Sequence, residues 1–302
     1  MSYHVPVMLK ECIDALGIKP DGVYVDVTFG GGGHSKEILK QLKGGKLYGF
    51  DQDPDAVQNT KDLDPRSFTL IPANFRYLKK YLRLNGIQQI DGLLADLGVS
   101  SHQFDSAERG FSTRFEGKLD MRMDQSSDLD AAVVINEYSE EQLHRIFGMY
   151  GELTNAKTAA NAVVKGRFKN KIETTQQLKD ALRSCAPRGK ENKYFAQLFQ
   201  ALRIEVNDEL GALQEMLLQS AEVIKPGGKL VVMSYHSLED RLVKNFIAKG
   251  KFFGEIEKDI YGNFSRPFEE IQKKPIEATE AEIEVNSRAR SAKLRVGVRT
   301  QS

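Results

Sequence analysis

Short apolar runs alternate with amphipathic stretches along the first hundred residues of the chain. The apolar runs begin at Tyr24 and recur at residues 46–51, 67–71 and 90–96, whereas residues 36–42 have the apolar spacing of a helix. The fourth run is almost wholly apolar, which is typical of a parallel strand buried on both faces. This alternation predicts an α/β fold with a doubly wound, Rossmann-like sheet.

The alternation stops near residue 108 and resumes near residue 204. The segment between has helical spacing and no convincing strand pattern, with predicted helices at residues 139–147, 155–164 and 175–185. Ser139 should cap the first of these helices. We therefore expect an all-helical domain inserted between the fourth and fifth strands. The expected division is residues 1–107 and 204–302 for the sheet-containing core, and residues 108–203 for the insertion.

The pattern after the insertion predicts the remaining elements of the core. Residues 205–224 should form one long helix, and residues 229–236 the fifth strand. Ser237 is expected to cap the next helix, with Asp240 completing a capping box. Residues 255–284 are acid-rich and suggest a surface hairpin or loop, and a basic loop then leads into a last strand.

Four consecutive glycines, residues 30–33, follow the first strand and precede a helix. Glycine permits a sharp turn and a close approach of the backbone to a ligand. Asp51 ends the next strand, where a carboxylate can accept hydrogen bonds from ribose hydroxyls. This pattern fits both NAD and S-adenosylmethionine. Asp26 in the first strand favours the latter, because a carboxylate suits a positively charged amino-acid group better than a pyrophosphate.

Two further positions lie at the carboxyl ends of predicted strands, where open α/β sheets bind ligands. Phe75 follows the third strand and could cover an adenine ring or belong to the core. Asp96 ends the fourth strand and precedes a loop with a glycine and two serines. Asp96 could bind only the cofactor or could also contact the substrate base.

Composition narrows the class of protein only slightly. The chain has 302 residues, a formal net charge of +1 and two cysteines, Cys12 and Cys185, without metal-ligand spacing. We expect reduced thiols, a cytoplasmic location and no zinc site. No apolar run has membrane-spanning length, and the first ten residues lack a signal-peptide pattern.

Basic residues are concentrated in two parts of the chain. Residues 157–193 contain ten Lys or Arg and three Asp or Glu, a local charge of +7. Such a patch can be a solvated face, but on a nearly neutral protein it also fits contact with an RNA backbone, and we select Lys169 and Lys171 as candidates. Arg288, Arg290 and Lys293 could contact phosphates or pair with the acidic 255–284 segment.

The order of several long motifs resembles one family along nearly the whole chain, the MraW-type methyltransferases that act on cytosine N4 in bacterial 16S ribosomal RNA. The motifs that carry this resemblance are residues 4–9, 26–35, 51–54, 91–101, 108–112, 119–124, 199–207, 226–228, 234–241 and 286–295. The sequence departs from the family pattern at residues 193–197, and the match around residues 155–167 is loose.

The resemblance implies a Rossmann-like enzyme that transfers a methyl group from S-adenosyl-L-methionine to a cytidine amino group in the decoding region. Its RNA partner would be met within the small ribosomal subunit or a precursor. Carried over by position, the cofactor contacts would be Gly32, Gly33, His34, Asp51, Phe75, Asp96 and Gln103.

Catalysis would need a hydrogen-bond acceptor for the amino protons of cytosine, because its N4 lone pair is delocalised into the ring. Asp96, Ser234 and His236 are the candidate catalytic residues at the strand ends, although His236 could equally be a structural residue at a helix entry. Two rival classes remain at this point, an NAD-dependent oxidoreductase and a non-catalytic RNA-binding or assembly factor. The sequence also leaves open whether the chain forms a homodimer.

Overall fold

The computed structural model describes residues 6–256 and 265–301 of the chain. Its contacts divide the chain into two compact units. The first unit joins Met1–Gly98 to Leu210–Ser302, and the second comprises Val99–Glu209.

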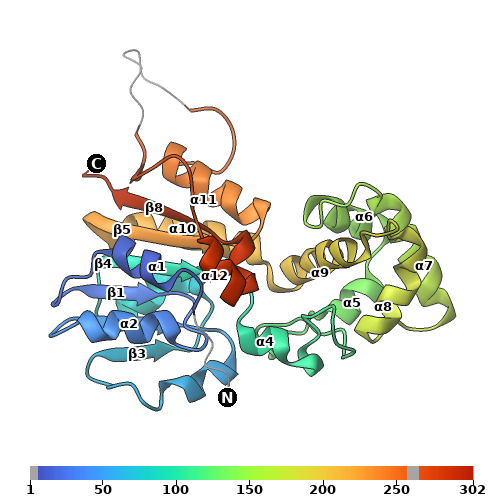
Figure 1. Ribbon diagram of the computed structural model, residues 1–302, viewed down its shortest axis with the longest axis horizontal. Coiled ribbons are helices and arrows are strands. Elements are labelled where there is room, and N and C mark those ends of the chain that lie inside the picture. The colour runs from blue at the N-terminus through green and yellow to red at the C-terminus, as the bar shows by residue number, and fades with distance from the viewer. Residues whose placement is uncertain (1–5, 257–264, 302) are drawn as a thin grey trace. The chain divides into compact units, whose positions relative to one another are not determined.

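The first unit is built on a mixed sheet with the order β3-β2-β1-β4-β5-β8-β6, and β7 pairs with β8 away from this path. The strands are β1 (Val23–Asp26), β2 (Lys46–Phe50), β3 (Phe68–Ile71), β4 (Ile90–Asp96), β5 (Ile224–Ser234), β6 (Phe268–Glu270), β7 (Ile276–Glu277) and β8 (Lys293–Arg299). Strands β1 to β5 all run parallel to one another, whereas β8 runs antiparallel to β5. The doubly wound sheet predicted from the sequence is confirmed (Figure 1).

Helices cover both faces of this sheet (Figure 1). They are α1 (Leu9–Leu16), α2 (Gly33–Gln41), α3 (Leu78–Leu84), α10 (Glu209–Val223), α11 (Ser237–Lys249) and α12 (Glu280–Val285), with 3-10 turns η1 (Pro54–Thr60), η2 (Phe75–Tyr77) and η5 (Ser287–Ser291). Helices α1 and α2 pack on one face of the sheet, and α3, α10 and α11 on the other. The α1 helix ends where Gly17 adopts a left-handed conformation, as the sequence predicts.

Successive side chains along each strand point to opposite faces of the sheet, so the sheet has a core layer on each face. On β1, Val25 faces the α3–α10–α11 layer and Tyr24 the α1–α2 layer. On β4, Leu93 and Leu94 divide in the same way, and both are fully buried. Each such side chain stabilises the fold by about 1.5–3 kcal/mol when removed from water. The core on both faces of the sheet fixes the strands, and with them the side chains at the carboxyl ends of the strands.

The second unit is helical. It contains α4 (Ser101–Asp105), α5 (Ala131–Glu137), α6 (Glu140–Met149), α7 (Ala156–Lys169), α8 (Thr175–Leu182) and α9 (Glu191–Asn207), with 3-10 turns η3 (Ala107–Arg109) and η4 (Arg183–Cys185). Its own core includes Phe147 and Leu198, both fully buried. Ser139 caps α6 in a capping box with Gln142, so the predicted cap is confirmed.

Two local predictions are wrong. The helix expected over residues 205–224 is interrupted at Asp208, whose φ of 45° ends α9 and separates it from α10. At the start of α11, His236 rather than Ser237 is the N-cap, and Glu239 rather than Asp240 completes the capping box. Asp240 instead forms a bidentate ion pair with Arg295, in which Nε lies 2.6 Å from Oδ1.

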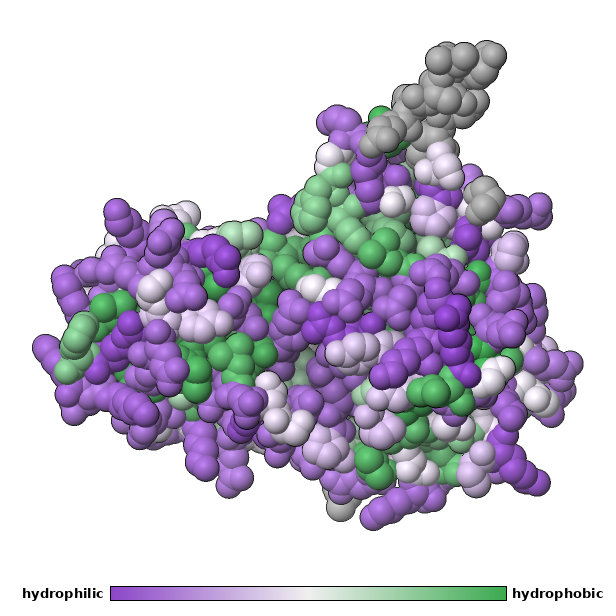
Figure 2. All heavy atoms as spheres, turned by 180° about the vertical axis from the view of Figure 1, so that it is seen from behind, coloured by the Kyte–Doolittle hydropathy of each residue, from purple (hydrophilic) through white to green (hydrophobic). Residues whose placement is uncertain are grey.

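Two strands of the acid-rich segment belong to the sheet. Residues 257–264 lie outside the described residues, but β6 and β7 from the same segment both pair with β8. The face drawn in Figure 2 is largely hydrophilic, with apolar areas scattered over it. Every helix of the described residues is too short or too polar to span a bilayer.

Candidate functional site

The glycine turn connects β1 to α2 at the carboxyl edge of the sheet. Gly30 and Gly32 have φ angles of 49° and 74°, which other residues rarely adopt. A Cβ on Gly33 would lie 2.2 Å from Pro6 Cγ, so close packing also requires glycine there. A Cβ on Gly31 would meet no atom of the described residues within 4 Å, so among these residues this side of the turn is open to a ligand.

Asp26, at the end of β1, stabilises the glycine turn through hydrogen bonds. Its Oδ2 accepts a hydrogen bond of 2.7 Å from Ser35 Oγ, and its Oδ1 accepts one of 3.1 Å from the Thr28 backbone. The residue is 1% exposed, and burial raises the pKa of its carboxyl. Asp26 therefore supports the turn from inside the protein, and its contact with the cofactor stays a prediction.

Asp51 joins the end of β2 to the same turn. Its Oδ2 accepts a hydrogen bond of 2.8 Å from Gly30 N, and its Oδ1 accepts one of 2.8 Å from Asp53 N. Burial, the largest influence, raises the pKa of Asp51 to about 6 despite these two donors. The side chain is half-buried and each oxygen retains a second lone pair, as a ribose ligand would require.

Phe75 opens the η2 turn after β3. Its ring packs against the core layer that includes Leu78, yet the residue is only half-buried. Both roles predicted for it are therefore compatible with its position: part of the ring belongs to the core, and part remains available to a ligand.

Asp96 ends β4, directly beside the end of β1. Its Oδ1 accepts a hydrogen bond of 2.6 Å from the hydroxyl of Tyr235, and its backbone N–H donates to Thr28 Oγ1 at 2.7 Å. The side chain is 24% exposed. Desolvation by the surrounding protein raises the pKa of this carboxyl to about 6, against the opposing influences of His34 and Tyr235.

His34 lies in the first turn of α2, and the structure brings it to Asp96. Its Nε2 is 3.1 Å from the carbonyl oxygen of Val7, which can only accept, so Nε2 carries the proton. Its Nδ1 is 3.8 Å from Asp96 Oδ2, beyond ordinary hydrogen-bonding distance. The imidazole therefore faces the carboxyl without a direct hydrogen bond to it.

Tyr235 is the site residue that the sequence analysis missed. Val231 and Met233 on β5 face the α1–α2 layer, and Tyr235 continues this alternation. Leu94 on β4 faces the same layer, so the alternation carries Asp96 to that side as well. Period-two reasoning applied to both strand ends would have paired Asp96 with Tyr235.

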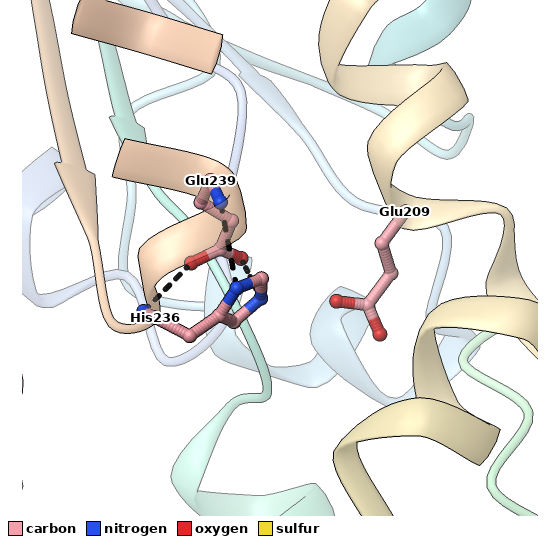
Figure 3. A group of neighbouring side chains, drawn as sticks. All are labelled: Glu209, His236 and Glu239. Atoms are coloured by element: carbon pink, nitrogen blue, oxygen red, sulfur yellow. Dashed lines mark hydrogen bonds and ion pairs between the residues drawn. The ribbon is translucent and has the colours of Figure 1, made fainter. Parts of the chain in front are cut away.

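The other two catalytic candidates are engaged in local structure. Ser234 is 2% exposed, and its hydroxyl donates to the Lys293 carbonyl at 3.4 Å. His236 caps α11 by accepting from Glu239 N at 3.4 Å through Nδ1, and its Nε2 lies 3.1 Å from the Glu239 carboxylate. Figure 3 shows this pair; Glu209, also drawn, belongs to the helical unit, where its Oε1 lies 2.8 Å from Arg203 Nε.

Three of the predicted contact residues lie in the helical unit. Gln103 completes a capping box at the start of α4 and accepts from Ser100 N at 3.0 Å, and it is 4% exposed. Its cofactor role stays a prediction. Lys169 ends α7 and Lys171 follows it, and both are exposed, as a contact with RNA would require.

The remaining basic candidates lie in the first unit near its C-terminus. Arg288 and Arg290 belong to η5, and Lys293 begins β8. Arg290 is exposed, whereas Arg288 and Lys293 are half-buried. Arg295, on the same strand, is held by Asp240 and so has a structural partner.

The strand order and the glycine turn after β1 place this chain in the class of Rossmann-like nucleotide- or nucleoside-binding folds, and the acidic strand ends suit a cationic ligand. Residues 1–300 match the MraW methylase family, and the chain belongs to that family. Membership of a methylase family confirms S-adenosylmethionine as the cofactor, in preference to NAD.

Two relatives illustrate the similarity. The ribosomal RNA small subunit methyltransferase H of Cytophaga hutchinsonii is 63% identical over 297 residues, covering 98% of this chain and 99% of the relative. That of Christiangramia forsetii is 59% identical over 297 residues, with 98% and 97% covered. Among solved structures, an rRNA methylase from Streptococcus thermophilus has a TM-score of 0.44 and 12% identity over the full length of both chains.

Proposed function

We propose that this protein methylates the exocyclic N4 amino group of a cytidine in the decoding region of 16S ribosomal RNA, in the cytoplasm. The small ribosomal subunit or its precursor would present the substrate. The names of the two relatives support the RNA class, and the motif resemblance supports the base and the atom. The observation that carries the proposal is the partly exposed carboxyl of Asp96 at the end of β4, held by Tyr235.

The residues at the strand ends suit a cationic nucleoside cofactor. Asp51 would accept hydrogen bonds from the ribose, the half-buried Phe75 would cover the adenine ring, and the open side of the turn at Gly31 would admit the ligand. His34 would line the site from the first turn of α2. A nearby cation would favour the ionised forms of Asp51 and Asp96, whose pKa values burial has raised to about 6.

Asp96 is the acceptor best placed to activate the amino group. The bound cofactor supplies an electrophilic methyl group, and in-line attack needs the two reacting atoms about 3–3.5 Å apart. Asp96 Oδ2 would accept a hydrogen bond from an N4 proton, so that the nitrogen lone pair is released from the ring. Asp96 would also take the proton that N4 gives up on receiving the methyl group.

RNA binding would use the exposed basic residues. Lys169 and Lys171 at the end of α7 would contact phosphates for the helical unit, and Arg288, Arg290 and Lys293 would do so for the first unit. Contacts of this kind orient the RNA without reading its sequence. The target base must be unpaired or turned out of its stack to meet a carboxyl at a strand end.

The decisive experiment is methyl transfer with a labelled methyl donor to small subunits and to naked 16S ribosomal RNA, followed by nucleoside analysis. We expect the label in N4-methylcytidine, and an Asp96→Asn variant should bind RNA normally but transfer much less label. Label in another nucleoside would refute the N4 assignment. Binding of the RNA without any transfer would instead indicate the non-catalytic assembly factor.

A further inference from the structure

Tyr235 and Asp96 form a short hydrogen bond at the edge of the candidate site. The Tyr235 hydroxyl lies 2.6 Å from Asp96 Oδ1, a short distance typical of a donor on an ionised acceptor. Oδ2 of the same carboxyl accepts no hydrogen bond from the described part of the chain, and the side chain remains 24% exposed. The two oxygens of Asp96 are therefore inequivalent before any ligand arrives.

We propose that Tyr235 is a positioning residue for methyl transfer, which holds Asp96 by Oδ1 and leaves Oδ2 as the oxygen that meets the amino group. This inference rests on the proposed function, because it assigns the orientation of the acceptor used there. A carboxylate free to rotate would present either oxygen in many orientations. The hydrogen bond from Tyr235 restricts this rotation, which is the kind of support that an acting side chain needs.

Tyr235 is itself firmly held. Its backbone N–H donates to Glu239 Oε2 at 2.9 Å, and its ring packs against the α1–α2 layer of the core. Burial raises the pKa of its hydroxyl well above the ordinary value, so the hydroxyl remains a proton donor throughout the working range. A permanent donor favours the ionised form of its acceptor.

Several other groups influence the carboxyl of Asp96. They are Asp26 on β1, His34 on α2 and Glu239 on α11, and Asp96 in turn raises the pKa of the buried Cys12 thiol on α1. All four remain in place when only the tyrosine hydroxyl is removed. A Tyr235→Phe variant therefore isolates the single hydrogen bond to Oδ1.

The test compares the pH profiles of methyl transfer for the wild type and Tyr235→Phe. Loss of a hydrogen bond to a charged acceptor should lower kcat about 10- to 100-fold near pH 7. The midpoint of kcat/KM, which reports the free enzyme, should rise by about one pH unit because the ionised form has lost its donor. Transfer should then recover in part at higher pH.

Tyr24→Phe is the matched control. Tyr24 lies in the same unit and is more completely buried than the half-buried Tyr235, and its hydroxyl accepts a hydrogen bond of 2.7 Å from the Lys19 backbone, near the start of β1 and away from the strand-end site. This variant should lose a hydrogen bond and some thermal stability but keep the wild-type midpoint. If Tyr235→Phe loses activity equally at every pH, or keeps the wild-type profile, the positioning role is refuted.

A readout without RNA separates this inference from the proposed function. The carboxyl of Asp96 can be titrated by carbon-13 NMR in the free protein, and Tyr235→Phe should raise its midpoint whatever the substrate is. An unchanged midpoint overturns the inference, whereas a shifted midpoint in a protein that does not methylate cytidine N4 overturns only the function. If Tyr235→Phe does not fold, replacing Tyr235 by 3-fluorotyrosine keeps the shape, strengthens the donor and should lower the midpoint instead.

Discussion

Binding of S-adenosylmethionine should become weaker as the pH falls from 7 to 5. The two strand-end carboxyls, Asp51 and Asp96, each have a pKa of about 6 because burial disfavours their ionised forms. A cationic ligand binds preferentially when they are ionised, so binding must release the protons that they carry. The direction follows from linkage: lowering the pH populates the protonated carboxyls and opposes binding.

The magnitude follows from the same two pKa values. At pH 5 a carboxyl with a pKa of about 6 is ionised in only about one molecule in ten, whereas at pH 7 it is ionised in about nine of ten. If one carboxyl must ionise, Kd should rise about tenfold between these pH values, and if both must, nearly 100-fold. The corresponding loss of binding free energy is about 1.4–2.7 kcal/mol.

Titration calorimetry tests this directly. Kd is measured at several pH values. Measurements near pH 6 in two buffers of different ionisation enthalpy give the number of protons released per cofactor, which should be about one half if one carboxyl must ionise and about one if both must. Asp51→Asn and Asp96→Asn should each reduce the pH dependence, because one titrating carboxyl is gone. Asp64→Asn removes an exposed carboxyl paired with Arg66 and should leave the pH dependence unchanged.

A constant Kd from pH 7 to pH 5, with no proton release, would refute the reasoning. It would show that the ligand does not lie against these carboxyls. A pH dependence that survives in the Asp51→Asn, Asp96→Asn double variant would place the linked group elsewhere in the molecule.

Three further perturbations test other parts of the structure. Charge reversal at Lys169 and Lys171 should weaken RNA binding, as measured by filter binding. It should also lower the slope of log Kd against log salt concentration, by about one unit for each phosphate that the variant no longer binds. His236→Ala should lower the melting temperature, through loss of an N-cap of about 1 kcal/mol, and keep most of kcat; a large loss of kcat at full stability would make His236 a direct participant. Arg295→Met should destabilise the fold by about 3 kcal/mol in urea denaturation, because it leaves the largely buried Asp240 unpaired; an unchanged midpoint would contradict this.

The charge reversal has its own matched control. Lys43 and Lys61 are exposed lysines of the first unit, far in the sequence from the basic insertion. Reversing both changes the net charge of the protein by the same amount. If this control lowers RNA affinity and salt dependence as much as reversal at Lys169 and Lys171, the effect is one of net charge rather than of local binding.

Most strands of the sheet and the two strand-end carboxyls of the site could be predicted from the sequence. Strands of a parallel sheet buried on both faces are recognisable as apolar runs, and the residue after each run marks the edge where ligands bind. Asp51 and Asp96 were found in this way. The break at Asp208 was missed because an aspartate, rather than a glycine, takes the left-handed conformation that ends α9.

The start of α11 shows a different limit. Sequence rules favour Ser237 as a cap, yet the imidazole of His236 occupies that position and Glu239 completes the capping box. The rules rank side chains by their intrinsic preference, whereas the choice here depends on where β5 ends. Once the cap moves by one residue, Asp240 is free of the capping box and pairs with Arg295.

Burial and a bound cation have opposite effects on the ionisation of the strand-end carboxyls. Burial disfavours the ionised form, and the positive charge of the ligand favours it. In the free protein, a pKa near 6 means that ionising Asp96 opposes folding, so this contribution to stability falls as the pH rises from about 4 to 6. Asp26, whose carboxyl is buried beneath the turn, adds to the effect. A cation bound against Asp51 and Asp96 reverses the sign, since it favours the charged forms. The hydrogen bond from Tyr235 acts in the same direction as the ligand, but permanently, which keeps Asp96 ready to accept a proton before the substrate arrives.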